Sequence, residues 1–465
     1  MTGRMADTSN LPGLTQRIAD YAVAAAGAPL PEPVVEKAKH HVLDTIAAMV
    51  SGAALPPGRL ARDYVRSLGG QEEASVVGAA FLTSAVNAAL ANAMAAHADE
   101  TDDSHPRSLT HPGCAVVPAA LAMAEREGSS GAEFLRAVVL GYDLCARFGV
   151  MLGAKRFLHE RGFDTHAFGG GMGAAAAAGM IAVRESTPMR HVLSYAAQQA
   201  AGLATLFRDT GHVEKAFVFA GMPARNGVAA ATMVEAGMTG VGDVFDGEPS
   251  FGTAFGVDLG ASQAFDDLGT VFEITHTNIK RWSVGSPVQA VLDSLEALMS
   301  RHAFTAADIT AVDVYLPATS ADVVDNRDMP SINVQHLAAL MLHDRTVSFA
   351  ASHDAKRMAD PGVLALRGKV KLIRSAELAY AEPARQAIVE LTLADRRKLR
   401  HHTEAVRGTG TNPMTRDEVA AKAYDLMYPS LGENGSRRVV ERVWELERLP
   451  SLAALGSLLQ GKAKR

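Results

Sequence analysis

The chain has 465 residues, of which 48% are hydrophobic and 6% aromatic, and its formal net charge is −6. This length exceeds the size at which one hydrophobic core keeps growing and favours two domains, while the negative charge gives no electrostatic basis for binding nucleic acid or an anionic membrane. Two cysteines, Cys114 and Cys145, are too few for a disulfide framework or for an iron–sulfur cluster held by this chain alone, and they favour a reducing compartment.

The N-terminal residues, MTGRMADTSNLPGLTQ, lack the apolar run of a signal peptide. The most apolar stretch, residues 166–183, consists mainly of Gly and Ala and lacks the long Leu/Ile/Val/Phe run of a membrane-spanning helix. We therefore expect a soluble, cytoplasmic protein without a membrane partner.

Helical patterns dominate from about residue 12 to residue 265. Residues 31–53 begin with Pro, repeat apolar residues at three- and four-residue steps, and reach Gly52 at the end of the pattern. The same spacing predicts helices at 82–100 and 131–152. The helix at 82–100 runs into a cluster of titratable residues that continues into a Pro-containing loop, so we expect loop side chains that face a cleft.

The pattern changes after about residue 270. Residues 309–317 and 384–395 alternate apolar and polar residues, which predicts half-buried strands. Between them, residues 333–344 predict a helix and residues 361–373 a helix followed by a strand. A Gly/Asn/Pro loop from residue 407 then leads into a helix capped by Thr415, and the last forty residues are helical again.

These elements together predict a mostly α fold. A large all-helical domain is formed by residues 1–270 and 405–465, and a smaller α+β domain, residues 271–404, is inserted between them. Because ligand sites favour clefts between domains, residues near these junctions are candidates for a site.

The titratable cluster lies in HADETDDSHPRSLTHPG, residues 97–113. It contains three histidines and four carboxylates: His97, His105, His111, Asp99, Glu100, Asp102 and Asp103. The histidines are not spaced as in a helical zinc site, and DETDDSHP lacks the Gly and the bidentate Glu of a calcium loop. A solvated acidic loop is the commonest explanation of DETDDS alone, but packed helices on both sides give these side chains defined directions. An acid/base site is therefore our preferred interpretation, without a metal.

The segment GGGMGAAAAAG, residues 169–179, is a weak match to a dinucleotide-binding fingerprint. It follows no strand, and no acidic residue stands at the expected distance. A helix of small residues that packs closely against its neighbours is the better interpretation. Just before it, RGFDTHAF contributes Arg161, Asp164 and His166 as polar candidates.

Two lysines are further candidates. Lys215 lies in DTGHVEKAFVFAGMPARNG, where a Gly/Met/Pro break follows an apolar run, and Lys280 lies in HTNIKRWSVGSP, at the junction of the two domains. Lysines are usually solvated surface groups, but the junction strengthens the case for Lys280.

The order of several motifs resembles the MmgE/PrpD family over nearly the whole chain. The motifs are HADETDDSHPRSLTHPG, RGFDTHAFGGGMGAAAAA, KAFVFAGMPARNG, IKRWSVGSP and RGTGTNP, with KHHVLDTIAAMVSG and GYDLCARFG also similar. The resemblance implies a helical domain built from both chain ends, an inserted α+β lid, a homodimer, and a site between the domains that needs neither a metal nor another cofactor.

The family's acidic-loop pattern is Asp, a spacer, Asp-Asp-Thr and a later His-Pro. Its positions fall here on Glu100, Asp102, Asp103, Ser104 and His111, so Glu and Ser replace the usual Asp and Thr. Lys215 and Lys280 fall at the positions of the family's two site lysines.

Two segments depart from the family pattern. Many members have His after Gly-Phe, where this chain has Asp164, with His166 two residues later. After Lys280, a Tyr-Pro-Ser-Cys-Arg-like run is replaced by RWSVGSP, which begins with Arg281. The general chemistry carries over from the resemblance, but the substrate of any one member does not.

The family's reactions place negative charge on a carboxylate-bearing substrate, which calls for cations and for a proton-transfer group. We expect His111 to transfer the proton, Glu100 and Asp103 to orient it or relay protons, and His166 to be a second acid/base candidate. Lys215 neutralises the polycarboxylate in this hypothesis, and the remaining substrate-binding candidates are Ser104, Lys280, Asp164 and Arg281.

The leading prediction is a metal-independent hydro-lyase that dehydrates a hydroxy di- or tricarboxylate. An epimerase, isomerase or decarboxylase using related chemistry is the alternative, and a non-catalytic binding protein on the same scaffold is the opposing class.

Overall fold

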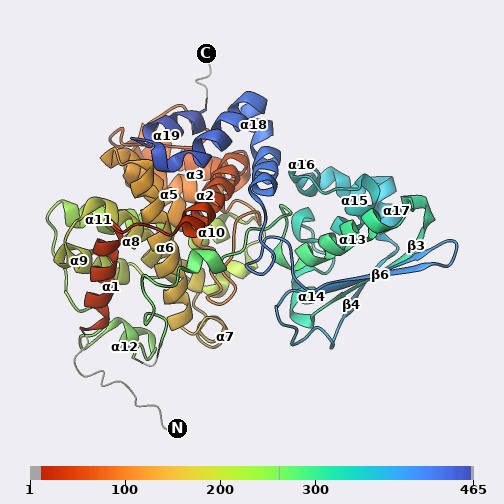
Figure 1. Cartoon of the computed structure of the whole chain (residues 1–465), viewed down its shortest axis with the longest axis horizontal. Helices are drawn as coiled ribbons and strands as arrows, with labels where there is room; N and C mark the ends of the chain where they lie inside the picture. The colour runs from red at the N-terminus through yellow and green to blue at the C-terminus, as the bar shows by residue number, and fades with distance from the viewer. Residues whose placement is uncertain (1–11, 261, 462–465) are drawn as a thin grey trace, which may run out of the picture.

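The computed structural model describes residues 12–260 and 262–461. It is mostly helical with a small sheet, as the sequence predicts. Buried apolar residues form two clusters, one from Ile18 to Ile279 and again from Met414 to Leu459, the other from Trp282 to Val406. Figure 1 shows the two parts side by side, with both chain ends in the larger one. We call residues 12–279 and 407–461 the helical lobe and residues 282–406 the sheet lobe.

The domain boundaries predicted at residues 270 and 404 concern folding units, which clusters of buried residues do not define, so they stay a prediction. Most of the N-terminal segment used to argue against a signal peptide, residues 1–11, lies outside the described residues. The homodimer and the cytoplasmic location also stay predictions.

The helical lobe contains fourteen α-helices among its described residues and a two-stranded antiparallel hairpin. They are α1 (Leu14–Ala25), α2 (Glu32–Gly52), α3 (Pro56–Leu68), β1 (Ala74–Ser75), β2 (Leu82–Thr83), α4 (Ala85–Ala96), α5 (Pro112–Glu127), α6 (Gly131–Met151), α7 (Lys155–Arg161), α8 (Thr165–Ala182), α9 (Ser186–Gln198), α10 (Val213–Ala216), α11 (Met222–Glu235), α12 (Phe251–Phe255), α18 (Arg416–Trp444) and α19 (Ala453–Leu459). In the described part of the chain no single helix has the length and apolar character to cross a membrane. α6 and α7, joined at a 53° bend, have that length and apolar character only when they are taken together.

The predicted helices at 31–53 and 131–152 are confirmed as α2 and α6. The helix predicted at 82–100 is shorter, because residues 82–83 pair as β2 and the helix α4 ends at Ala96. Thr415 caps α18, with its side chain and that of Glu418 bonding each other's backbone N–H groups. α18 packs against α2, which brings helices from the N-terminal and C-terminal parts of the chain side by side (Figure 1).

The Gly/Ala-rich segment forms α8, which packs closely against α5, α6 and α11. A Cβ atom placed on Gly173 would lie 2.4 Å from the carbonyl oxygen of Gly141 on α6. The backbones of α6 and α8 therefore touch at this point, and the prediction of a closely packed helix is confirmed. This rigid contact supports the N-terminal end of α8, where Asp164 and His166 lie.

The sheet lobe has one four-stranded sheet in the order β4-β3-β5-β6. β3 pairs in parallel with β4 and antiparallel with β5, which pairs antiparallel with β6. The elements are α13 (Gln289–Arg301), β3 (Ile309–Leu316), α14 (Ala318–Val324), α15 (Val334–Asp344), α16 (Phe349–His353), α17 (Pro361–Arg367), β4 (Val370–Arg374), β5 (Ala387–Leu393) and β6 (Lys398–Thr403). The predicted strands at 309–317 and 384–395 are β3 and β5, and residues 361–373 form α17 and β4; β6 had not been predicted.

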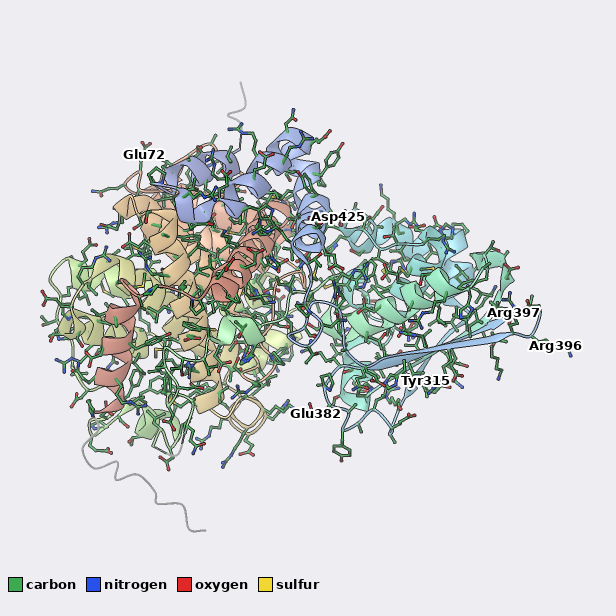
Figure 2. All side chains as sticks on the ribbon, viewed as in Figure 1. Glu72, Tyr315, Glu382, Arg396, Arg397 and Asp425 are labelled. Carbon is green, nitrogen blue, oxygen red and sulfur yellow. The ribbon has the colours of Figure 1, made fainter. Side chains whose placement is uncertain are left out.

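The short helix α16 connects the two lobes. Phe349 packs into the core of the helical lobe, and its backbone N–H donates to Asp425 on α18 at 2.7 Å. At the other end of α16, His353 Nε2 lies 2.8 Å from Asp99 Oδ2, and this carboxylate raises the pKa of His353 against the opposing effect of burial. Figure 2 labels Asp425 at this boundary. The sheet lobe is thus bonded directly to the titratable loop.

The close contact at Gly173 predicts an unequal response to two neighbouring glycine substitutions. Gly173→Ala should destabilise the fold by about 1–3 kcal/mol, because the added methyl group meets backbone on α6. Gly171→Ala, two residues away on the same helix with no atom near the added group, should stabilise it by up to about 1 kcal/mol. Urea unfolding of both variants measures the difference, and equal effects would contradict the packing described.

Candidate active site

The titratable residues lie in the loop between α4 and α5, which we call the acidic loop (residues 97–111). His97 follows the last residue of α4, and His111 directly precedes α5. Asp99, Asp102 and Asp103 are buried. The interpretation as a solvated loop is therefore wrong, since a solvated loop would expose these carboxylates.

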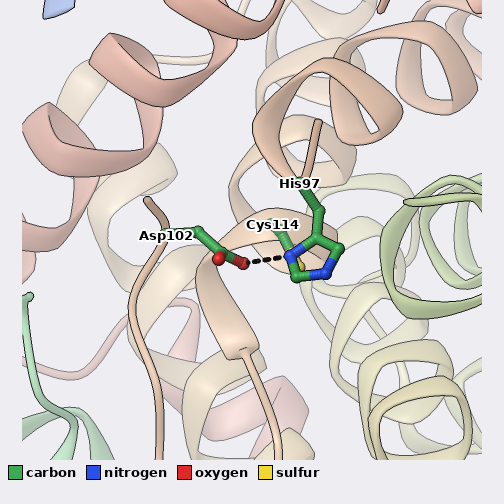
Figure 3. Close-up of side chains that lie close together, drawn as sticks. All are labelled: His97, Asp102 and Cys114. Carbon is green, nitrogen blue, oxygen red and sulfur yellow. Dashed lines mark hydrogen bonds and ion pairs between the residues drawn. The ribbon is translucent and has the colours of Figure 1, made fainter. Parts of the chain in front are cut away.

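The Asp102 carboxylate is the centre of the acidic loop. Its Oδ2 atom lies 2.8 Å from His97 Nδ1 and 3.1 Å from His111 Nδ1, and its Oδ1 atom lies 3.6 Å from Lys280 Nζ. Figure 3 shows the bond between His97 and Asp102. Because an ionised carboxylate only accepts hydrogen bonds, both Nδ1 atoms carry the proton in these contacts.

Burial and charge set the protonation states of this group. Burial opposes ionisation of Asp102, but His97, His111 and Lys280 outweigh it and hold the pKa of Asp102 well below its usual value. Burial lowers the pKa of His111 to about 3, although the Asp102 carboxylate opposes this. His111 is therefore neutral near pH 7 in the free protein, and 12% of its side chain remains exposed.

The two predicted lysines converge on Glu100. Lys215, on α10, forms an ion pair with the Glu100 carboxylate, and Lys280 Nζ donates to the Glu100 carbonyl oxygen at 2.6 Å. Burial opposes ionisation of Glu100, but the two lysines outweigh it and hold the pKa of Glu100 well below its usual value. Two cations from distant parts of the sequence thus lie around one edge of the acidic loop.

Asp103 has a different environment from Asp102. It accepts hydrogen bonds from His41 Nδ1 at 2.8 Å, Tyr142 Oη at 2.6 Å and the Gly113 N–H at 3.0 Å. These partners belong to α2, α6 and α5, so Asp103 ties the acidic loop to three helices. In the structure it is Asp102 that contacts His111, whereas the sequence assigns this contact to Glu100 or Asp103.

A second imidazole lies beside the first. His166, in the first turn of α8, has Nδ1 3.1 Å from Asp164 Oδ2, while Asp164 Oδ1 accepts from the N–H of Ala167 and caps the helix. The rings of His166 and His111 are 5.0 Å apart. Asp164, predicted to bind substrate, is fully buried with both oxygens bonded. Its contacts are those of a residue that orients His166.

The ring of Phe219 forms one wall of this group. It stacks on His166 at 3.8 Å and on His97 at 4.7 Å between ring centroids, and Lys215 Nζ lies 5.2 Å from it. Phe219 belongs to the π-helical turn η2 (Phe217–Gly221), where α10 continues into α11. Such turns occur frequently at functional sites.

A cavity of about 480 Å³ lies where the two lobes meet. Ser104 and Lys280 line it, and Ser104 is held by two backbone hydrogen bonds to Asn278. Residues 383–385, 406–407 and 409–411 line its other walls. Lys280 therefore contacts both the cavity and the Asp102 group.

Arg281 is not brought to this cavity. Its guanidinium pairs with Glu296 on α13 and lies over the ring of Trp282, two residues of the sheet lobe.

Three side chains of the acidic loop and α5 offer atoms that could hold a metal ion. They are His97, Asp102 and Cys114 (Figure 3). The bond between His97 and Asp102 already uses the facing nitrogen and oxygen, and Lys280 supplies a positive charge beside the carboxylate. Burial, with Asp102 and Asp103 adding to it, raises the pKa of the Cys114 thiol well above its usual value. This donor set fits a metal ion poorly, because the thiolate is the ligand form of cysteine.

Several residues of the site were given no individual role from the sequence. His97 and Asp102 stand in the acidic motif, and their role could have been suspected from it. Phe219 lies in an apolar run that resembles any core segment. Arg385, which lines the cavity, comes from the sheet lobe and carries no motif around it.

Two family models and several known proteins are similar to this chain over most of its length. The model of the MmgE/PrpD N-terminal domain matches residues 16–263, and that of the MmgE/PrpD C-terminal domain matches residues 282–446. The chain is 24% identical to cis-aconitate decarboxylase of Aspergillus terreus over 493 aligned positions, covering 100% of this chain and 99% of that protein. It is also 24% identical to cis-aconitate decarboxylase of Homo sapiens over 457 positions, covering 93% and 91%.

The different environments of Asp102 and Asp103 predict that removing the contacts of each residue has different effects on turnover and stability. Asp102→Asn should lower turnover by at least about 100-fold, since it removes the negative charge beside two imidazoles and replaces one acceptor oxygen with a donor NH2 group. Tyr142→Phe removes one of three donors to Asp103 and should lower the free energy of unfolding by about 1–3 kcal/mol while changing turnover less than about threefold. Steady-state kinetics and urea unfolding measure both, and comparable turnover in the two variants would refute the assignment.

Proposed function

The chain belongs to the MmgE/PrpD family, and from this we propose that it is a lyase acting on a small polycarboxylate. The sequence alone predicted dehydration of a hydroxy acid. Full-length similarity to two proteins named cis-aconitate decarboxylase favours loss of carbon dioxide from an unsaturated tricarboxylate of the cis-aconitate type.

One observation supports this proposal most strongly. Lys215 and Lys280, 65 positions apart in the sequence, meet at the acidic loop beside two imidazoles, His111 and His166, each held by its own buried carboxylate. Cations of this kind stabilise negative charge on a polycarboxylate, and oriented imidazoles transfer protons. The partial exposure of Glu100, Lys215, His111 and His166, between 11% and 17% of each side chain, leaves them within reach of a bound molecule.

Decarboxylation of such a substrate requires two events. The bond to the departing carboxylate carbon breaks, and its electron pair moves through the adjacent double bond to the far carbon, next to another carboxylate. A proton is then added at that carbon, giving an unsaturated dicarboxylate. Lys215 and Lys280 are suited to stabilise the carbanion, and His111 is our candidate for the proton donor.

The charge of His111 fits this role once the substrate is present. In the free protein burial keeps its imidazole neutral, with a pKa of about 3. A polyanion bound nearby favours the protonated ring and raises this pKa. Substrate binding therefore favours protonation of His111, and His166 is the second candidate for the same step.

Proton abstraction is the second candidate chemistry. The neutral His111 of the free protein, with Nδ1 bonded to Asp102, leaves Nε2 available as a base. A base at this place would start the dehydration or epimerisation of a hydroxy acid, which keeps the hydro-lyase prediction open.

Product analysis separates the reactions. Incubation with cis-aconitate in D₂O should release carbon dioxide and place one deuterium in the dicarboxylate product, as detected by mass spectrometry and NMR. Hydroxy di- and tricarboxylates tested in parallel should remain unchanged. Alkene formation from these acids, or deuterium exchange into them without carbon dioxide, would replace decarboxylation by dehydration or epimerisation.

The proton-transfer role predicts a linkage between binding and pH. Because the pKa of His111 is about 3 in the free protein and raised in the complex, binding of a non-reacting tricarboxylate should take up a proton and tighten as the pH falls through the raised pKa of the complex toward 3. His111→Gln should lose this uptake and about 10²–10⁴-fold in turnover. Calorimetry in buffers of different ionisation enthalpy measures the uptake, and the variant corrects for protonation of the ligand itself. Full turnover in the folded variant would eliminate the assignment.

A further inference from the structure

The cavity between the lobes is lined by one cationic side chain that forms no ion pair within the described residues. Arg385 stands just before β5, in the sheet lobe, and it lines the cavity together with Lys280 and Ser104. Figure 2 labels Glu382, from the same loop, on the side of the sheet lobe that faces the helical lobe. The loop thus carries Arg385 to the junction of the lobes.

The other arginines of the cavity are already paired. Arg407 pairs with Glu418 and donates to Asn412, and Arg107 lies 3.6 Å from Glu273. Arg385 has no hydrogen bond or ion pair among residues 12–260 and 262–461. The Glu100 carboxylate attracts Arg385 electrostatically, but this carboxylate already forms an ion pair with Lys215.

The backbone of Arg385 is unusual for its residue type. Its φ angle is +70°, in the left-handed region that side-chain-bearing residues rarely adopt. Arg396, in the turn between β5 and β6, has the same φ angle, but Figure 2 shows it at the far tip of the sheet lobe. Arg385 and Arg396 therefore share the residue type and the φ angle, one at the cavity and one far from it, which provides a matched control.

We propose that Arg385 is a specificity-determining residue that binds one carboxylate of the substrate, so that the sheet lobe adds a third cation to Lys215 of the helical lobe and Lys280 of the junction between the lobes. Three cations match three carboxylates, and the planar guanidinium suits bidentate binding of one of them. The inference rests on the proposed function, since it names the substrate class of the same site as a tricarboxylate.

The test compares Arg385→Gln with Arg396→Gln. In the first variant the KM for cis-aconitate should rise about 10- to 100-fold, with kcat changed much less, because a charge-assisted bond is lost. Arg385→Lys should recover part of this loss, and Arg396→Gln should match the unmodified chain. Affinity for tricarballylate, a saturated tricarboxylate, should fall by a similar factor, whereas that for glutarate, a dicarboxylate, should change little.

The outcomes separate this inference from the proposed reaction. Unchanged KM and tricarballylate affinity in folded Arg385→Gln would overturn the role of Arg385 while the lyase stands. Arg385-dependent binding of tricarballylate without turnover of cis-aconitate would support the residue's role and overturn the decarboxylase. Equal losses for tricarballylate and glutarate would also overturn the inference, because Arg385 would then not select the third carboxylate.

Discussion

The arrangement of the site depends on the buried carboxylate of Asp102. Removing a carboxylate from water costs several kcal/mol unless partners replace the water, and Asp102 obtains them from His97, His111 and Lys280. These partners come from the end of α4, the start of α5 and the junction of the two lobes. Because a buried charge tolerates little misplacement of its partners, the same interaction that stabilises the loop also fixes the direction of the His111 ring.

Other buried charges attach the acidic loop to both lobes. Lys422 on α18 donates to the Thr101 carbonyl oxygen and pairs with Asp44 on α2. Asp99 bonds to His353 on the sheet lobe. The loop is therefore attached to the N-terminal helices, the C-terminal helix and the sheet lobe at once.

The parts that the sequence predicts well are those with a local cause. The capping box at Thr415, the Gly/Ala pattern of α8 and the alternation in β3 each depend on neighbours within a few residues, and the structure has them. The different hydrogen-bond partners of Asp102 and Asp103 have no such local cause. Adjacent residues of an irregular loop point in different directions, and only the positions of His41 and Tyr142 decide which carboxylate turns toward the helices.

The same reasoning explains why Phe219 escapes prediction. In AFVFAG it resembles a core residue at helical spacing, and a regular helix would direct it according to that spacing. The π-helical turn η2 inserts one extra residue into the turn, which changes the direction of the side chains that follow. Phe219 then lies against His166 and His97. An apolar ring in this position excludes water from the imidazoles. The low pKa of His111, which lies 5.7 Å from the same ring, is set first by such burial. A local irregularity of the backbone thus contributes to the burial that lowers the pKa of His111.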